Sequence, residues 1–186
     1  MIRKATTEDL SNVAALYQEL HAYHDTHRNY CNWDKRIYPV RATAEDAVKR
    51  GFLYVCEREE TPDGESGGNG NPILAAVILN HIQPKEYRGV SWKTAAEGEE
   101  VFVIHTLAVS PRARKQGLGK KMVSFAEALG KSLGCKVMRF DTSAFNKPAY
   151  TLYTGLGYRV AGKTLVETSE SMIQMLYCFE KKLCDD

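Results

Sequence analysis

The chain has 186 residues, enough for one well-packed core, and we expect a single domain over residues 1–186. Apolar residues make up 44% and charged residues 26%, which excludes disordered and fibrous classes. Lys and Arg number 25 against 23 Asp and Glu, and this near balance argues against nucleic-acid binding through overall charge. No apolar stretch is long enough to cross a membrane, no signal peptide is visible, and five dispersed cysteines suit a reducing compartment. We therefore expect a cytoplasmic protein without membrane contact.

The first half of the chain reads as alternating strands and helices. Residues 1–5 predict a strand, and Thr6-x-x-Asp9 predicts the start of a helix that fades near His24. An aromatic-rich connection follows, and Thr43-x-x-Asp46 predicts a short helix that stops at Gly51. Apolar runs at 52–57 and 73–82 predict two strands. Between them, TPDGESGGNGNP has the composition of a mobile hairpin tip.

The second half begins with a polar loop over 83–100 and an apolar run over 101–109, which predicts a central strand. Residues 117–134 predict a strongly amphipathic helix, and 136–142 predict a strand. Asn146 can cap a further helix with Pro148 in its first turn, before closing strands at 158–160 and 172–179. The order β-α-α-β-β-β-α-β-α-β-β predicts one α/β domain, with a mixed sheet and helices on both faces.

The turn from Ser110 to Gly119 joins the central strand to the amphipathic helix and is a candidate anion site. Its two glycines allow backbone N–H groups to approach a phosphate. Five cations gather there although cations at a helix N-terminus oppose its dipole, and a bound polyanion would explain them: Arg112, Arg114, Lys115, Lys120 and Lys121. A solvated turn is the alternative. The pattern lacks the upstream glycine of a P-loop, and Met122 stands where a dinucleotide fold needs a third glycine.

Several motifs in order carry a family resemblance over about fifty residues, from His105 to Tyr158. They are Leu107-Ala-Val109, Arg114-x-x-Gly117-x-Gly119, the amphipathic helix, the strand ending at Asp141, and Asn146-x-x-Ala149-x-x-x-Tyr153 before Gly155-Leu-Gly-Tyr158. With this combination the chain resembles the GNAT superfamily of acyl-CoA N-acyltransferases. The resemblance implies a splayed sheet of about seven strands that admits the thioester of acetyl-CoA, the expected acyl donor, and no metal.

The resemblance also implies which residues bind the cofactor. Backbone amides of the turn would hold the pyrophosphate; these are Arg114, Lys115, Gln116, Gly117, Leu118, Gly119 and Lys120. The strand residues Leu107, Ala108 and Val109 would bind the pantetheine arm, and Asn146 would lie beside it. A noncatalytic CoA-binding or sensing module of the same fold remains an alternative, and a nucleotide-dependent oxidoreductase is another.

His105 is our candidate for the general base. An alkylamine has a pKa of about 10.4, so only about one molecule in 2,500 is nucleophilic at pH 7 and a proton must be removed. His105 shares strand parity with Leu107 and Val109, and an unperturbed imidazole is mostly neutral at pH 7. A structural hydrogen bond, or a bulge that turns the ring away, is the alternative. Glu99 and Glu100 are rival bases acting through water.

Tyr153 stands where the family usually places a tyrosine near the CoA sulfur. It could donate a hydrogen bond to the leaving thiolate, although a phenol of pKa about 10 is a weaker acid than a thiol of about 8.5. An ordinary packing role is the alternative, and Tyr150, one helical turn earlier, is a rival for the catalytic role.

The acceptor is an unidentified amine, either a small molecule or a protein amino group, and a homodimer stays open. Tyr30, Trp33 and Tyr38 are candidate walls of its pocket, because aromatic faces favour a cation, or they simply pin a long connection. His21, His24 and His27 recur every third residue, but the helix fades there and a metal site is disfavoured.

Overall fold

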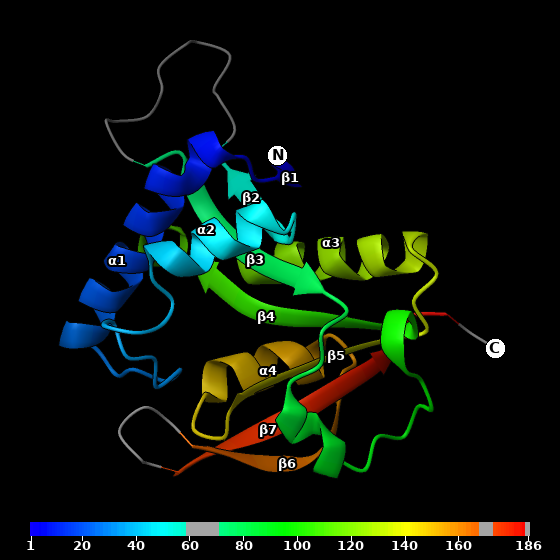
Figure 1. The fold of residues 1–186 in the computed structure, drawn as a ribbon. Helices are drawn as coiled ribbons and strands as arrows, with labels where there is room; N and C mark the ends of the chain where they lie inside the picture. Colours follow the sequence, from blue (N-terminus) through cyan, green and yellow to red (C-terminus); the bar gives the residue numbers. More distant parts are fainter. Residues whose placement is uncertain (59–70, 168–172, 185–186) are drawn as a thin grey trace. The chain divides into compact units, whose positions relative to one another are not determined.

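The computed structural model describes residues 1–58, 71–167 and 173–184 (Figure 1). Most of the predicted hairpin tip lies outside these residues. The elements are β1 (Ile2–Lys4), α1 (Leu10–Thr26), α2 (Arg41–Lys49), β2 (Leu53–Glu57), β3 (Ile73–Asn80), β4 (Val101–Val109), α3 (Leu118–Ser132), β5 (Val137–Ser143), α4 (Lys147–Gly155), β6 (Arg159–Glu167) and β7 (Ile173–Lys182). The seven strands form one sheet in the order β1-β2-β3-β4-β5-β7-β6, and the predicted sequence of elements is confirmed.

Several element boundaries differ from the prediction, among them those of α2 and β6. Helix α2 begins at Arg41, before Thr43, because the Thr43 hydroxyl accepts the Val40 backbone N–H at 3.1 Å from within the first turn. Strand β6 extends to Glu167, far beyond the predicted residue 160, because it pairs with β7 from Arg159 opposite Glu180 to Glu167 opposite Ile173. Long-range pairing of this kind leaves a weak local signal in the sequence.

The chain divides into two compact units. The first holds Met1–Asn29, Trp33–Ile78 and Thr106–Met122. In it β1, β2 and β3 pair antiparallel, and α1 and α2 cover a core that includes Val13, Leu16 and Tyr17. This unit carries the turn that follows β4.

The second unit holds Tyr30–Asn32, Leu79–His105 and Val123 onward. The start of β4 pairs parallel with β5, and β5, β7 and β6 pair antiparallel. The 83–100 loop packs on this part of the sheet, because Tyr87, Val90 and Ala96 share a core cluster with Val101 and Val103. Within the described residues, no helix is long and apolar enough to cross a membrane.

Candidate active site

Strand β4 alternates in burial over its second half. His105, Leu107 and Val109 are partly exposed, whereas Thr106 and Ala108 are fully buried. This period of two is that of a regular strand, so His105 shares its side of the strand with Val101 and Val103. The bulge that would have turned the imidazole away is not seen in this alternation.

The hydrogen bond of His105 defines its tautomer. Its Nε2 lies 2.8 Å from the Oδ1 atom of Asn80, which is buried at the end of β3. The same oxygen accepts the backbone N–H of Ile82 at 2.7 Å, so the atom is an acceptor and the imidazole must donate through Nε2–H. In the neutral ring, Nδ1 then carries the lone pair, which is the atom a base needs.

Pairing between β4 and β5 is short. It comprises Val101 with Val137, Phe102 with Met138 and Val103 with Arg139, and no further pair follows in the second unit. Strand β5 nevertheless continues to Ser143, paired only with β7 in this stretch. The second unit therefore contains an open strand edge beyond Arg139, as the predicted splay requires.

Asp141 lies on this open stretch of β5. Its Oδ2 accepts the hydroxyl of Tyr87, from the 83–100 loop, at 2.8 Å. Burial raises the pKa of the Asp141 carboxyl, and the hydrogen bond from Tyr87 acts in the opposite direction. The sequence marked Asp141 only as the end of a strand. Its contact with Tyr87 depends on the path of a long loop, for which the sequence holds no signal.

Asn146 begins α4 as predicted. Its Oδ1 accepts the Ala149 N–H at 3.2 Å, so the side chain caps the helix, and Pro148 stands in the first turn. Its Nδ2 donates to the Thr142 hydroxyl at 3.1 Å and lies 3.5 Å from the Cys31 sulfur. The contact with Cys31, from the long aromatic connection, was not foreseen, since it joins residues more than a hundred positions apart.

Tyr153 is buried on α4 and packs against Phe140 and Phe179, with ring centroids 4.3 and 5.6 Å away. Burial raises the pKa of its hydroxyl, and nearby Cys31 and Asp141 act in the same direction. The phenol therefore stays protonated and is a hydrogen-bond donor, not a ready acid. Tyr150, the rival, is 40% exposed and packs against Tyr177 with the two rings tilted by 60°.

The turn before α3 has the backbone that an anion cradle needs. Lys115 and Gly117 have positive φ angles of 62° and 74°, and nothing lies within 4 Å of a Cβ placed on Gly117. Helix α3 begins directly after, at Leu118, so its first N–H groups have no partner within the helix. The backbone N–H of Arg114 donates to the Pro111 carbonyl at 3.4 Å. The N–H groups that could bind an anion are therefore those of the residues after Arg114.

The cations of the turn divide into two sets. Arg112 pairs with Glu19 of α1 at 2.7 Å, and the Arg114 guanidinium lies 4.8 Å from the ring centroid of Tyr23. These two side chains anchor the turn to α1. Lys115, Lys120 and Lys121 are exposed, so they are the cations best placed for a solvent-borne polyanion.

The three aromatic residues predicted to line the acceptor pocket are divided between the two units. Trp33 and Tyr38 pack edge to face at 5.9 Å, and the Tyr38 hydroxyl bonds the Thr106 hydroxyl, all in the first unit. Tyr30 belongs to the second unit. His21 bonds the Pro39 carbonyl at 2.9 Å. Among described residues, no three His, Cys, Asp or Glu side chains are grouped to hold a metal.

Glu100 is a poor base. It pairs with Lys136, which lowers the pKa of its carboxyl, and it also accepts the Glu97 N–H at 3.2 Å. A carboxylate that binds protons this weakly is seldom protonated at neutral pH and takes protons less readily than an imidazole. Glu99 is exposed beside it. His105 therefore stays our preferred candidate for the base.

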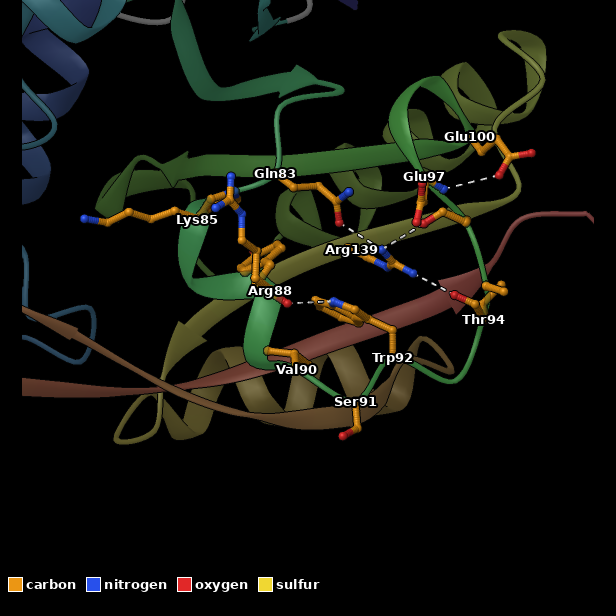
Figure 2. A pocket seen from close by; sticks show the side chains of 14 residues that line it. Gln83, Lys85, Arg88, Val90, Ser91, Trp92, Thr94, Glu97, Glu100 and Arg139 are labelled. Carbon is orange, nitrogen blue, oxygen red and sulfur yellow. Dashed lines mark hydrogen bonds between the residues drawn. The ribbon is translucent and has the colours of Figure 1, made fainter.

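The 83–100 loop lines an open pocket of about 980 Å³ (Figure 2). Arg139 reaches into it from β5 and donates to Gln83 at 2.8 Å and to the Thr94 carbonyl at 2.7 Å, with Trp92 stacked on its guanidinium at 4.4 Å. Glu180, fully buried, accepts the Lys93 N–H at 2.7 Å. These two charged groups fasten the loop to the sheet, so the position of Tyr87 is fixed.

Comparison with known proteins identifies the family. The family model described as "Acetyltransferase (GNAT) family" matches residues 13–158. The D-amino-acid N-acetyltransferase HPA3 of Saccharomyces cerevisiae is 32% identical over 90 residues, which are 48% of this chain and 49% of that protein. The thialysine N-epsilon-acetyltransferase of Bos taurus is 26% identical over 84% of this chain and 82% of its own. The alignment with the yeast relative thus spans about half of that protein's length.

Solved structures show the same fold. A GNAT-family acetyltransferase from Streptococcus agalactiae superposes with a TM-score of 0.76 at 18% identity, covering 98% of this chain and 94% of its own. The Salmonella typhimurium protein yncA, solved with its cofactor acetyl-CoA, superposes with a TM-score of 0.66 at 18% identity, covering 100% and 95%. Since the family model matches well over half of its residues, the chain belongs to the acetyltransferase (GNAT) family.

Proposed function

We propose that the protein transfers an acetyl group from acetyl-CoA to a primary amine by direct attack, with His105 as the base. The observation that carries this proposal is the Asn80–His105 hydrogen bond, which leaves Nδ1 as the basic nitrogen beside an open strand edge. When bound, acetyl-CoA supplies an activated thioester carbonyl. His105 takes the proton that the amine must lose to become nucleophilic.

The residues of the first unit suit the phosphate end of the cofactor. We assign the pyrophosphate to the backbone N–H groups of residues 115–120, because two positive φ angles and the start of α3 point amides outward. Lys115 and Lys120 add charge there. Leu107, Ala108 and Val109 are assigned to the pantetheine arm on the family resemblance.

The residues of the second unit suit the thioester end. Asn146 is assigned to the side of the pantetheine arm. Tyr153 is assigned to the sulfur, where its protonated hydroxyl donates a hydrogen bond to the departing thiolate. Its raised pKa, caused by burial, means that the proton stays on the phenol, so Tyr153 would stabilise a thiolate by hydrogen bonding and not by proton transfer.

The test is release of free thiol from acetyl-CoA across a panel of amines, in wild type and in two variants. His105→Ala should lower kcat/KM about 10²- to 10⁴-fold, the range of a lost general base, while Tyr153→Phe should lower it less. Tyr150→Phe is the matched control on the same helix and should keep wild-type turnover. Full activity in both His105→Ala and Tyr153→Phe would refute the assignments.

A noncatalytic CoA-binding module of the same fold would give a different pattern. It would bind acetyl-CoA in a titration but release no thiol above the uncatalysed rate with any amine. The buried Asn80, which is positioned to orient an imidazole and has no evident use in cofactor binding, favours catalysis over this alternative.

A further inference from the structure

The pairing register of β4 and β5 places His105 and Asp141 at equivalent positions along the two neighbouring strands. The last β4–β5 pair joins Val103 to Arg139, and two residues further along each parallel strand lie His105 and Asp141. His105 and Asp141 are not paired with each other in the sheet. They therefore lie on either side of the open strand edge. Neighbouring strands lie about 4.8 Å apart where they pair and further apart beyond.

Both side chains are on the side of the sheet covered by the 83–100 loop. Val101, Val103 and Val137 pack with that loop in one cluster, and side chains two apart on a strand share a face. Each also has a direct contact there. His105 is hydrogen-bonded to Asn80, which lies just before the loop. Asp141 accepts a hydrogen bond from Tyr87, which lies within the loop.

Asp141 has unused acceptor capacity. A carboxylate has about four lone-pair sites, and the only hydrogen bond to Asp141 among the described residues comes from Tyr87, to Oδ2. The residue as a whole is partly exposed, although its carboxyl is buried enough for its pKa to be raised. A carboxylate so placed attracts a cation, and the Tyr87 hydroxyl keeps its orientation.

The cation that Asp141 binds should not be the reacting amine. A carboxylate against an ammonium stabilises the charged form and would oppose the proton transfer to His105. A second ammonium group of the same substrate, a few bonds from the reacting amine, would favour the reaction. Its attraction to Asp141 brings the reacting nitrogen to His105 without stabilising the protonated form of that nitrogen.

We propose, on the basis of the acetyltransfer assigned above, that Asp141 is a specificity-determining residue that selects acceptors carrying a second ammonium group close to the reacting amine. The substrate class is then short diamines, polyamines and diamino acids. Asp141 binds one end and His105 deprotonates the other.

The experiment compares diaminopropane with propylamine, and diaminobutane with butylamine, in wild type and Asp141→Asn. Wild type should prefer the diamines by about tenfold or more in kcat/KM, the equivalent of one ion pair in a partly buried site. Asp141→Asn keeps the shape and should lose the preference through a higher acceptor KM, with kcat and the KM for acetyl-CoA little changed.

Tyr87→Phe is the matched variant, since it removes the hydrogen bond to Asp141 but keeps the carboxylate; it should retain most of the preference. Thermal midpoints of both variants within a few degrees of wild type exclude unfolding as the cause. A diamine preference that survives Asp141→Asn, or turnover without any preference in wild type, overturns the inference. Absence of thiol release with every amine, despite acetyl-CoA binding, instead refutes the proposed function on which it rests.

Discussion

The hydrogen bond between His105 and Asn80 matters because an imidazole has two nitrogens with different roles. As long as Asn80 accepts from Nε2–H, the lone pair is at Nδ1. Asn80 also accepts the Ile82 N–H, so its amide cannot rotate without losing that bond. The backbone that ends β3 thereby fixes the protonation geometry of the proposed base.

Replacing Asn80 by Asp tests this role. A carboxylate at this place stabilises the protonated imidazole, so the neutral base forms only at higher pH. The acid limb of the kcat/KM profile against pH should therefore move up by about one unit or more, the lower end of the effect of a close opposite charge. The profile is measured with a saturating acetyl-CoA concentration.

The result for Asn80→Asp distinguishes a catalytic role of His105 from a purely structural one. A purely structural His105 would leave the position of the acid limb unchanged, even if the variant were less stable. Asn80→Ala is the companion variant, which should lower kcat without a comparable displacement of the limb, because it removes orientation and adds no charge.

At the scale of elements, the turn into α3 is the feature on which cofactor binding depends. Gly117 has a φ of 74° and open space around a Cβ, and Gly134, beyond the other end of α3, has a φ of 78° and equally open space. A side chain at either position costs about 1–2 kcal/mol of conformational strain. Only the side chain at Gly117 would stand in the proposed phosphate cradle.

We therefore predict different consequences for Gly117→Leu and Gly134→Leu. Both should lower the free energy of unfolding by about 1–2 kcal/mol, measured by chemical denaturation. Only Gly117→Leu should weaken acetyl-CoA binding, by about tenfold or more in a calorimetric titration, because its side chain blocks the approach of phosphate to the amides. Equal affinity in the two variants would contradict the cradle.

These elements also show what the sequence can and cannot predict. The apolar run of β4 and the helical periodicity of α3 are local signals, and both elements were predicted within two residues of their ends. The cap at Asn146 is local too. The contacts of Asp141 with Tyr87 and of Asn146 with Cys31 depend on strand register and loop path, which single-sequence periodicity does not contain.

Considered as a whole molecule, the protein should be stabilised by its cofactor. A ligand that binds only the folded state at a hundred times its Kd adds about 2.7 kcal/mol to the free energy of unfolding. For a protein of this size each kcal/mol raises the thermal midpoint by about 2–4 °C, so saturating acetyl-CoA should raise it by about 5–10 °C.

The same measurement with NAD or NADP tests the remaining alternative from the sequence, a nucleotide-dependent oxidoreductase. We expect neither nucleotide to change the midpoint at concentrations where acetyl-CoA does, because the turn has Met122 where a dinucleotide fold places its third glycine. Gly117→Leu serves as the control, since it should reduce the shift produced by acetyl-CoA. A midpoint raised by NAD or NADP and unaffected by acetyl-CoA would overturn both the cofactor assignment and the acetyltransfer that depends on it.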